Sequence, residues 1–394
     1  MSVRKVKENI FSVGVSHWDR THFDEIVTLP NGTSYNSYLV FGEKKTALID
    51  TVDPYLTEVF INNLRKFDGL KIDYVVSLHA EQDHSGNIPK VLEIFGEAKV
   101  VTNEKCKELL IEHLNIPEEK FIVVSDGEEL DLGGKTLKFL LTPWVHWPET
   151  MSAYLKEDKI LFSCDFFGSH YATSRLFADT SELVLENAKL YYAEIMMPFR
   201  NFIKTNIEKI ENFDIEMIAP SHGPIWNKPS FIINAYKEWI SPSVKNKVLI
   251  LYVSMHGSTK IIVNELYNRL VEYGVEVLPF NLFSADIGKI AINAVDAATA
   301  VFAIPTFLTG PHPLGANAAY VVNAIKPKLR FAGFITSFGW GGVTIKWLRD
   351  HLKNLKADTL FEFEFKGIPK ASDIEKVKEL AEKIYQAHKS IGIL

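Results

Sequence analysis

The most informative segment of this chain reads Ser77-Leu78-His79-Ala80-Glu81-Gln82-Asp83-His84-Ser85-Gly86-Asn87. It continues a predicted strand, Tyr74–His79, and a helical pattern follows it. The carboxyl ends of strands are where α/β folds present ligands. If the segment stays extended, His79, Glu81 and Asp83 point to one side and His84 to the other. Because imidazole and carboxylate groups are suitable metal ligands, this one segment can supply two neighbouring metal ions.

Three further candidate ligands lie downstream, each at the predicted end of a strand. His146 lies in a loop between two prolines, Asp165 follows the predicted strand Lys159–Cys164, and His222 lies in a Pro-flanked loop. A single histidine or aspartate at such a place is usually a hydrogen-bonded surface group, a turn residue or a helix cap. Seven candidates in this order instead predict a two-metal site, with the two carboxylate oxygens of Asp165 as the bridge.

Composition limits the class of protein. The chain has 394 residues, of which 47% are hydrophobic and 23% charged, and this length suggests two globular domains. Its net charge of −6 comes from interspersed charges of both signs, which disfavours nucleic acid as a partner. The two cysteines, Cys106 and Cys164, are too few for a disulfide scaffold or an iron–sulfur cluster. We expect a cytoplasmic protein without a membrane span, since no apolar run approaches ~20 residues and a signal-peptide pattern is missing.

The pattern of predicted strands changes along the chain. Residues 1–244 combine short strands with helical stretches, which favours two sheets flanked by helices. Their predicted strands are Tyr35–Phe41, Thr46–Thr51, Tyr74–His79, Lys99–Thr102, Leu137–Leu141 and Lys159–Cys164. Residues 245–394 alternate apolar strands with helices, which predicts a doubly wound parallel sheet. The strands of this second part are Val248–Val253, Val275–Asn281, Ala300–Ile304, Phe331–Ser337 and Thr359–Phe365.

Three loops at strand ends of the second part form another candidate site. They comprise Ser254, Met255, His256, Gly257, Ser258 and Thr259; Pro305, Thr306, Phe307, Leu308, Thr309 and Gly310; and Ser337, Phe338, Gly339, Trp340, Gly341 and Gly342. A helix predicted to begin near Lys260 places hydroxyls and backbone N–H groups at a helix N-terminus, a setting that binds phosphate. The other two loops offer polar groups and aromatic walls for a flat ring. Ordinary turn and cap chemistry is the alternative.

The two candidate sites together carry a family resemblance. The H-x-[EH]-x-D-H segment with the later ligands resembles the metallo-β-lactamase fold, whose hydrolases usually have His where this chain has Glu81. With its second part included, the chain resembles the flavodiiron proteins over nearly its full length. The resemblance implies a metallo-β-lactamase-like αββα sandwich over residues 1–244. It also implies a flavodoxin-like domain that binds flavin mononucleotide (FMN) over residues 245–394.

The resemblance also implies roles for individual residues. It assigns one iron to His79, Glu81, His146 and Asp165, and the other to Asp83, His84, Asp165 and His222. In the family a tyrosine approaches the di-iron pocket, and the segment Tyr191–Phe199 is similar to that region. Tyr192 is the candidate, with a core aromatic as the alternative. His22 and His170 are candidates for an outer layer around the ligands, or else ordinary surface histidines.

The activity that the resemblance implies is reduction of O₂ to water, of nitric oxide (NO) to N₂O, or both. The FMN would relay electrons from a separate small carrier such as a rubredoxin. A head-to-tail homodimer would bring each flavin to the partner's irons. Two alternatives stay open on sequence alone. One is a zinc hydrolase with a fused flavodoxin domain, and the other is a non-catalytic FMN electron carrier.

Overall fold

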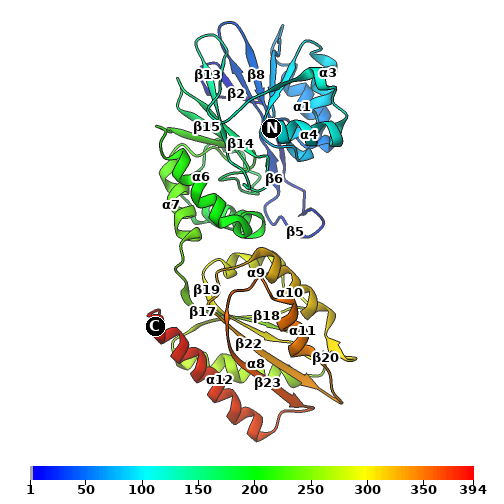
Figure 1. Cartoon of the computed structure of the whole chain (residues 1–394), viewed down its shortest axis with the longest axis vertical. Helices are drawn as coiled ribbons and strands as arrows, with labels where there is room; N and C mark the ends of the chain where they lie inside the picture. The colour runs from blue at the N-terminus through cyan, green and yellow to red at the C-terminus, as the bar shows by residue number, and fades with distance from the viewer. Residues whose placement is uncertain (1–2) are drawn as a thin grey trace. The chain divides into compact units, whose positions relative to one another are not determined.

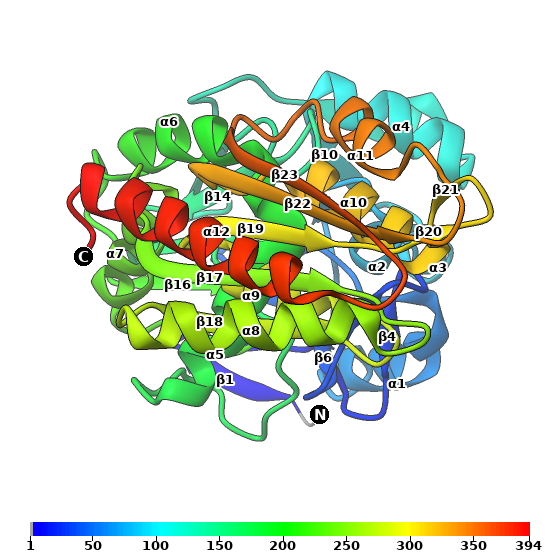
Figure 2. The ribbon, with the colours of Figure 1, turned by 90° about the horizontal axis from the view of Figure 1, so that it is seen from below.

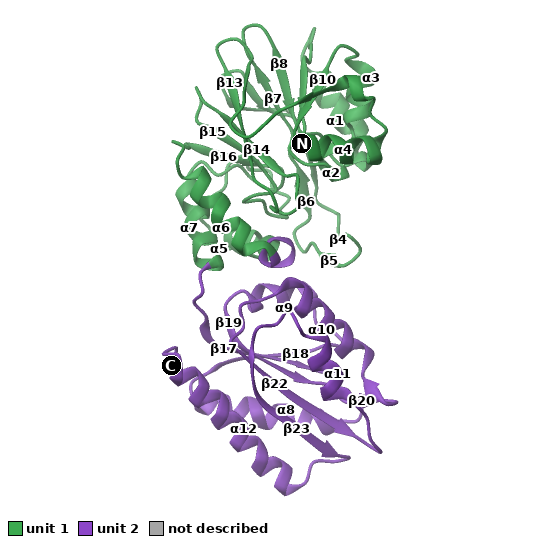
Figure 3. Cartoon of the chain, viewed as in Figure 1, with its two compact units in different colours: residues 1–192, 199–240 green, residues 193–198, 241–394 purple. Residues whose placement is uncertain are grey.

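The computed structural model describes residues 3–394, and the chain divides into two compact units (Figure 3). Unit 1 extends to Tyr192 and resumes over Phe199–Ile240, whereas unit 2 consists of Ala193–Pro198 and Ser241–Leu394. The boundary between residues 244 and 245 remains a prediction. No helix within residues 3–394 combines the length and the apolar character that a membrane crossing needs.

Unit 1 contains two large sheets within the described residues (Figure 1). In spatial order the first consists of β1 (Arg4–Lys7), β2 (Ile10–Ser12), β7 (Tyr38–Phe41), β8 (Thr46–Ile49), β9 (Tyr74–Val76), β10 (Lys99–Thr102) and β11 (Phe121–Val123). The second consists of β12 (Glu129–Asp131), β13 (Thr136–Leu141), β14 (Met151–Leu155), β15 (Ile160–Cys164) and β16 (Met217–Pro220). Two short pairs complete the unit: β3 (Val15–His17) with β6 (Thr33–Tyr35), and β4 (His22–Phe23) with β5 (Val27–Thr28).

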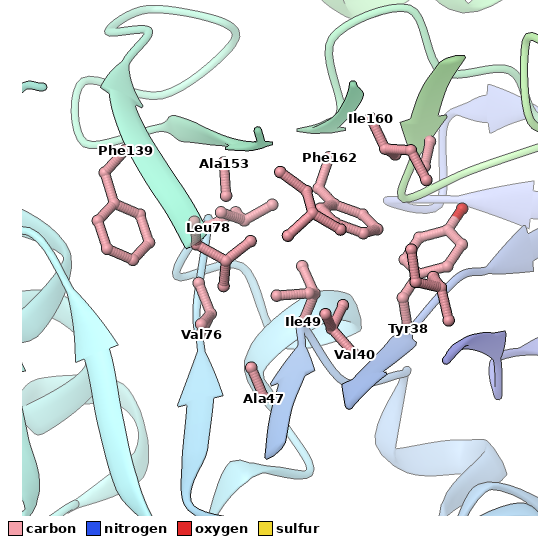
Figure 4. Close-up of a cluster of buried hydrophobic side chains, with 14 of the residues drawn as sticks. Tyr38, Val40, Ala47, Ile49, Val76, Leu78, Phe139, Ala153, Ile160 and Phe162 are labelled. Atoms are coloured by element: carbon pink, nitrogen blue, oxygen red, sulfur yellow. The ribbon is translucent and has the colours of Figure 1, made fainter. Parts of the chain in front are cut away.

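The two sheets enclose a core between them (Figure 4). Ile49 and Val76 from the first sheet meet Phe139 and Phe162 from the second, all at most 1% exposed. Val75, the neighbour of Val76 on β9, points to a second core on the opposite face of its sheet. That core lies under the helices α1 (Thr57–Leu64), α3 (Ile88–Ile94) and α4 (Glu104–Leu114). Each fully buried large apolar side chain contributes ~1.5–3 kcal/mol, so alternation along the strands stabilises both layers.

The remaining helices of unit 1 follow the second sheet in the chain. They are α5 (Glu182–Tyr191), α6 (Arg200–Ile210) and α7 (Pro229–Ile240), of which α6 and α7 pack together beside that sheet (Figure 1). Helices on both sides of two stacked sheets make the predicted αββα sandwich.

Unit 2 has a parallel sheet with helices on both faces. Its spatial order is β18 (Glu276–Asn281), β17 (Lys245–Tyr252), β19 (Ala297–Ala303), β22 (Phe331–Phe338) and β23 (Asp358–Lys366). This is the predicted flavodoxin-like order. The helices α8 (Ser258–Glu272) and α12 (Ala371–Ser390) cover one face side by side (Figure 2). The other helices are α9 (Ile287–Ala294), α10 (Pro313–Ile325) and α11 (Thr344–His351), and a hairpin joins β20 (Thr306–Phe307) to β21 (Gly310–Pro311).

One predicted strand, Tyr35–Phe41, is divided in the structure into β6 and β7. Asn36 causes the interruption, because its backbone N–H donates to Ser221 O at 2.7 Å instead of joining a ladder. Its side-chain amide also donates to the carbonyl oxygens of Pro220 and Gly223, at 2.8 and 2.7 Å. The break therefore fixes the loop that carries His222.

Candidate metal centre and phosphate-binding loops

The segment from His79 to His84 does not stay extended. A one-turn helix, α2 (Gln82–Ser85), begins directly after Glu81 and turns Asp83 away from it. The expectation that Asp83 shares a side with His79 and Glu81 therefore fails, since its condition of an extended chain is not met. The predicted ligands instead form two groups whose ligand atoms lie within 4.8 Å of one another: His79, Glu81, His146 and Asp165, and Asp83, His84 and His222. A third set, Asp50, His84 and Cys164, meets the same limit and shares His84 with the second group.

Asp165 lies between these two groups, directly after β15. Its Oδ2 is 3.6 Å from His79 Nε2 and 3.5 Å from His146 Nε2. Its Oδ1 is 3.1 Å from His84 Nε2 and 3.4 Å from His222 Nε2. Each oxygen of the carboxylate thus faces one group, which is the geometry that a bridging ligand needs.

The other two carboxylates each serve one group. Glu81 Oε2 lies 3.1 Å from His79 Nε2 and 3.3 Å from His146 Nε2. In the second group, Asp83 Oδ1 is 3.3 Å from His84 Nε2 and Asp83 Oδ2 is 3.2 Å from His222 Nε2. The structure therefore brings together all seven predicted ligands, and all four imidazoles present Nε2 inward.

Burial makes it costly to hold the charged carboxylates and imidazoles of this site close together. His79, His84 and Asp165 are at most 1% exposed. Burial lowers the pKa of His146 and His222, but the surrounding carboxylates outweigh it and raise these values to about 9 and about 10. Burial likewise opposes ionisation of Asp165, yet the facing histidines hold its pKa well below the usual range. The pocket is thus built to hold several charges close together, which requires cations or protons between the carboxylates.

The hydrogen bonds of the ligand atoms favour metal cations over protons as the positive charge between the carboxylates. Within residues 3–394, both oxygens of Asp83, both oxygens of Asp165 and both ring nitrogens of His84 lack a hydrogen bond of acceptable geometry. Buried polar atoms without such partners are rare in folded proteins. Atoms that converge without pairing are what two metal ions would require, so the residues fit a two-metal centre.

An outer layer of groups orients the ligands. His222 Nδ1 lies 2.7 Å from Ser34 O, and His79 Nδ1 lies 2.6 Å from Glu149 Oε1. Burial opposes ionisation of Glu149, but its hydrogen bond with His79 lowers its pKa overall. Asp50 accepts from Leu78 N at 2.8 Å and from Ser221 Oγ at 3.1 Å, which ties the motif segment to the loop of His222. Sequence reasoning missed Glu149 and Asp50, because nothing local marks either of them.

The structure places the two adjacent tyrosines differently. Tyr191 packs with its ring centroid 5.8 Å from that of His222 and 4.8 Å from that of His170. Burial, and then the charge of Asp165, raises the pKa of its hydroxyl well above the usual value. Tyr192 instead packs on Tyr236 and Trp239, with centroids 5.4 Å from each, and its hydroxyl donates to Trp239 O at 3.5 Å. The structure thus brings Tyr191, and not the predicted Tyr192, to the metal centre.

Aromatic residues wall the second group of ligands. The ring of Phe23 stacks on that of His170 at 5.4 Å and meets that of His222 edge-on at 6.4 Å. His170 Nδ1 is 2.9 Å from Thr33 Oγ1, and burial lowers the pKa of this histidine well below its usual value. His170 therefore lies beside the ligands as a neutral group, whereas His22 is exposed and pairs with Thr21.

The three predicted loops of unit 2 meet at the carboxyl end of its sheet. Thr259 Oγ1 lies 3.0 Å from Ser337 Oγ, which links the first loop to the third. Val343, the residue directly after the third loop, donates through N to Thr309 O of the second loop at 3.0 Å. Gly257 precedes α8 with a φ of 91°, a left-handed conformation that favours glycine.

These loops combine polar and apolar groups. Backbone N–H groups at the start of α8 suit a phosphate, helped by the positive end of the helix dipole. Trp340 and Leu308 are 73% and 69% exposed, so large apolar surfaces stand open at the same edge. A flat aromatic ring attached to a phosphate fits this combination.

Comparisons with known proteins find relatives over nearly the full length of the chain. Residues 33–223 match a family model described as ODP family beta lactamase. A nitric oxide reductase of Moorella thermoacetica is 33% identical over 388 residues, covering 96% of this chain and 97% of the relative. The flavo-diiron protein FprA2 of Clostridium acetobutylicum is 32% identical, covering 97% and 98%. A solved structure of rubredoxin oxygen:oxidoreductase from Desulfovibrio gigas superposes with a TM-score of 0.95 at 29% identity, covering 99% of both chains. With its metal groups, its loops and these relatives, the chain belongs to the flavodiiron protein family.

Proposed function

We propose that this chain is an oxidoreductase that reduces O₂ to water, NO to N₂O, or both, at a di-iron site supplied with electrons by FMN. The observation that carries the proposal is the convergence of four imidazoles and three carboxylates with Asp165 shared between the two groups. Carboxylate-rich, anionic ligation suits iron. The names of the relatives, nitric oxide reductase and rubredoxin oxygen:oxidoreductase, support the same chemistry.

Each group of residues would hold one iron. His79, Glu81 and His146 would bind the first and Asp83, His84 and His222 the second, with Asp165 in common. When bound, the iron pair and the flavin supply one- and two-electron chemistry that amino-acid side chains lack. The protein's own contribution is to fix the ligands in place and to keep the pocket dry, since most of these side chains are fully buried.

The wall of the pocket supplies proton-holding groups. Tyr191 retains its proton at neutral pH because its pKa is raised, so its buried hydroxyl is available to donate toward the ligands. His170 stays neutral and packs between Tyr191 and Phe23. Phe23 adds an apolar surface beside His222, which suits small uncharged gases.

Unit 2 would hold the flavin. The loop Ser254–Thr259 and the start of α8 would bind the FMN phosphate, while Pro305–Gly310 and Ser337–Gly342 would flank the ring. In this proposal residues 1–244 form the di-iron domain and residues 245–394 the FMN domain. A separate small carrier, such as a rubredoxin, would reduce the flavin. A head-to-tail homodimer would bring flavin and irons of different subunits together.

The test combines metal and flavin analysis with turnover. Purified protein, loaded with iron and FMN, is mixed anaerobically with a reduced rubredoxin, and O₂ or NO is added in parallel. We expect two irons and one FMN per chain, with consumption of at least one gas at a rate proportional to enzyme. Stable binding of zinc with consumption of neither gas would overturn the proposal, and an esterase assay on the same sample would then test the hydrolase.

A further inference from the structure

Glu149 forms a hydrogen bond with a ligand histidine but faces away from the metal centre. Its Oε1 lies 2.6 Å from His79 Nδ1, and both side chains are completely buried. A carboxylate only accepts, so Nδ1 must carry the ring proton. The lone pair of His79 is then at Nε2, the atom that faces Glu81 and Asp165. Glu149 therefore fixes both the orientation and the tautomer of this ligand.

Among the described residues, neither histidine of the second group has a carboxylate hydrogen-bonded to its Nδ1. The nearest counterpart is the pair of His222 Nδ1 and Ser34 O at 2.7 Å, in which the acceptor is a neutral carbonyl. Throughout residues 3–394, His84 Nδ1 finds no hydrogen-bond partner. The first group thus has Glu81, the shared Asp165 and Glu149 around it, and the second has Asp83, the shared Asp165 and Asp50. The groups differ in that Glu149 forms a direct hydrogen bond with His79, whereas His84 Nδ1 has no hydrogen-bond partner within residues 3–394.

The backbone of Glu149 is held independently of its side chain. Asn103 Nδ2 donates to Glu149 O at 2.6 Å, while Asn103 Oδ1 accepts from Cys106 N as the N-cap of α4. The next residue, Thr150, donates through Oγ1 to Thr142 O at 2.6 Å. Removal of the charge alone therefore leaves the loop in place, and the effect of that charge can be measured separately.

We propose that Glu149 is a positioning residue that makes the two halves of the metal centre unequal. By accepting the His79 proton it gives the ring imidazolate character, so the metal held by His79, Glu81 and His146 binds more tightly and oxidises more easily than its neighbour. Anionic partners of ligand histidines act in this direction in metal sites generally. The statement about oxidation rests on the proposed di-iron function, whereas the statement about affinity requires only a divalent metal.

The test is stepwise metal binding by Glu149→Gln. The amide keeps the size of the side chain and loses the charge. Metal-free protein is titrated anaerobically with Fe²⁺, which is followed by Mössbauer spectra, or with Co²⁺, which is followed by absorption. We expect one binding step to weaken about 10- to 100-fold while the other is unchanged. In iron-loaded protein we expect the potential of one iron to rise while that of FMN stays the same.

A second variant identifies which half is affected. Asp83→Asn removes a ligand charge from the other group, so it should weaken the other step, and the double variant should weaken both. If Glu149→Gln weakens the same step as Asp83→Asn, both steps equally, or neither, the proposal is overturned. Glu128→Gln is the control, because this exposed glutamate only caps Ser125 N at 2.8 Å and should change neither step.

Misfolding of the Glu149→Gln variant and failure of the proposed function can each be distinguished from failure of this proposal. If Glu149→Gln does not fold, Glu149→Asp decides, because it keeps the charge at a longer distance and should weaken the same single step by less. An unaffected step in a folded Glu149→Asp protein would then overturn the proposal. Failure of the wild-type protein to consume either gas would overturn the proposed function while leaving its two metal-binding steps to be measured.

Discussion

The ring of Tyr191 lies 5.8 Å from that of His222, tilted by 51°, and the ring of its neighbour Tyr192 packs against Tyr236 instead. Successive residues of a helical turn point about 100° apart. Of these two tyrosines, only Tyr191 therefore lies beside the proposed metal ligands. Substitution of Tyr192 provides the matched control for substitution of Tyr191.

Replacement of Tyr191 by Phe should reduce gas consumption without loss of metal. General-acid groups contribute ~10²–10⁴-fold to rates, so we expect kcat to fall by at least about tenfold. Tyr192→Phe removes only a 3.5 Å hydrogen bond to Trp239 O and should change stability by at most ~1 kcal/mol. Steady-state rates, metal content and thermal unfolding of both variants provide the measurement. Equal loss of activity in the two would contradict a role for Tyr191.

Removal of the shared carboxylate should affect both metals together. Asp165 faces all four ligand imidazoles at 3.1–3.6 Å, so Asp165→Ala should lower the affinity for both metals and abolish gas reduction. FMN content should stay at the wild-type level, because the three loops belong to unit 2. Metal and flavin analysis after desalting measures both effects. Asp126→Ala, at an exposed residue paired with Lys209, is the control, and unchanged turnover in Asp165→Ala would exclude the proposed site.

Because of Glu194, the free energy of unfolding should fall as pH rises. Burial raises the pKa of this carboxyl to about 8, and neither oxygen has a hydrogen-bond partner within residues 3–394. The folded protein then keeps the proton that the unfolded chain loses above its ordinary pKa of about 4.3. Stability therefore decreases from about that pH up to about pH 8 and becomes constant above it.

Glu194→Gln should remove this dependence. Denaturant unfolding at pH 5 and pH 8.5 should show the variant more stable than the wild type at the higher pH by roughly 2–4 kcal/mol, with a much smaller difference at the lower pH. The outcome that counts against the assignment is a parallel pH dependence in both proteins.

Gly257 should matter for flavin binding through its backbone. A Cβ there would meet no atom of residues 3–394 within 4 Å, so Gly257→Ala costs only the strain of a φ near 91°, about 1–2 kcal/mol. If the loop relaxes to avoid that strain, the N–H groups before α8 move and FMN binding weakens by about tenfold. Fluorescence titration of the flavin-free protein measures the affinity.

Gly274 provides the matched control. It also has a positive φ, 75°, and open space around it, but it lies after the C-terminal end of α8. Gly274→Ala should lose similar stability and bind FMN normally. Equal weakening of FMN binding in both variants would mean that general destabilisation, and not the loop, is responsible.

The sequence alone was sufficient for the fold and for naming seven residues that the structure brings together. The strands of unit 2 are near-continuous apolar runs because both faces of the sheet are covered, so β17, β19 and β22 begin within three residues of their predicted positions. The ligands follow strands or lie in loops next to them, and their residue types limit what they can do. Ligand-type residues next to a predicted strand form a local pattern, and a local pattern can be recognised from the sequence.

Tertiary structure decided the features that depend on helical phase or on distant contacts. The turn of α2, in place of an extended chain, puts Asp83 beside His84 and His222, the residues with which the resemblance had grouped it. Helical phase also brings Tyr191, and not Tyr192, next to His222. Glu149 meets His79 from 70 positions away, and Asp50 reaches Ser221 across 171. A sequence records which side chains are present, but packing fixes which of them face each other, because a rotation of one residue or a contact between separate loops leaves no local signature.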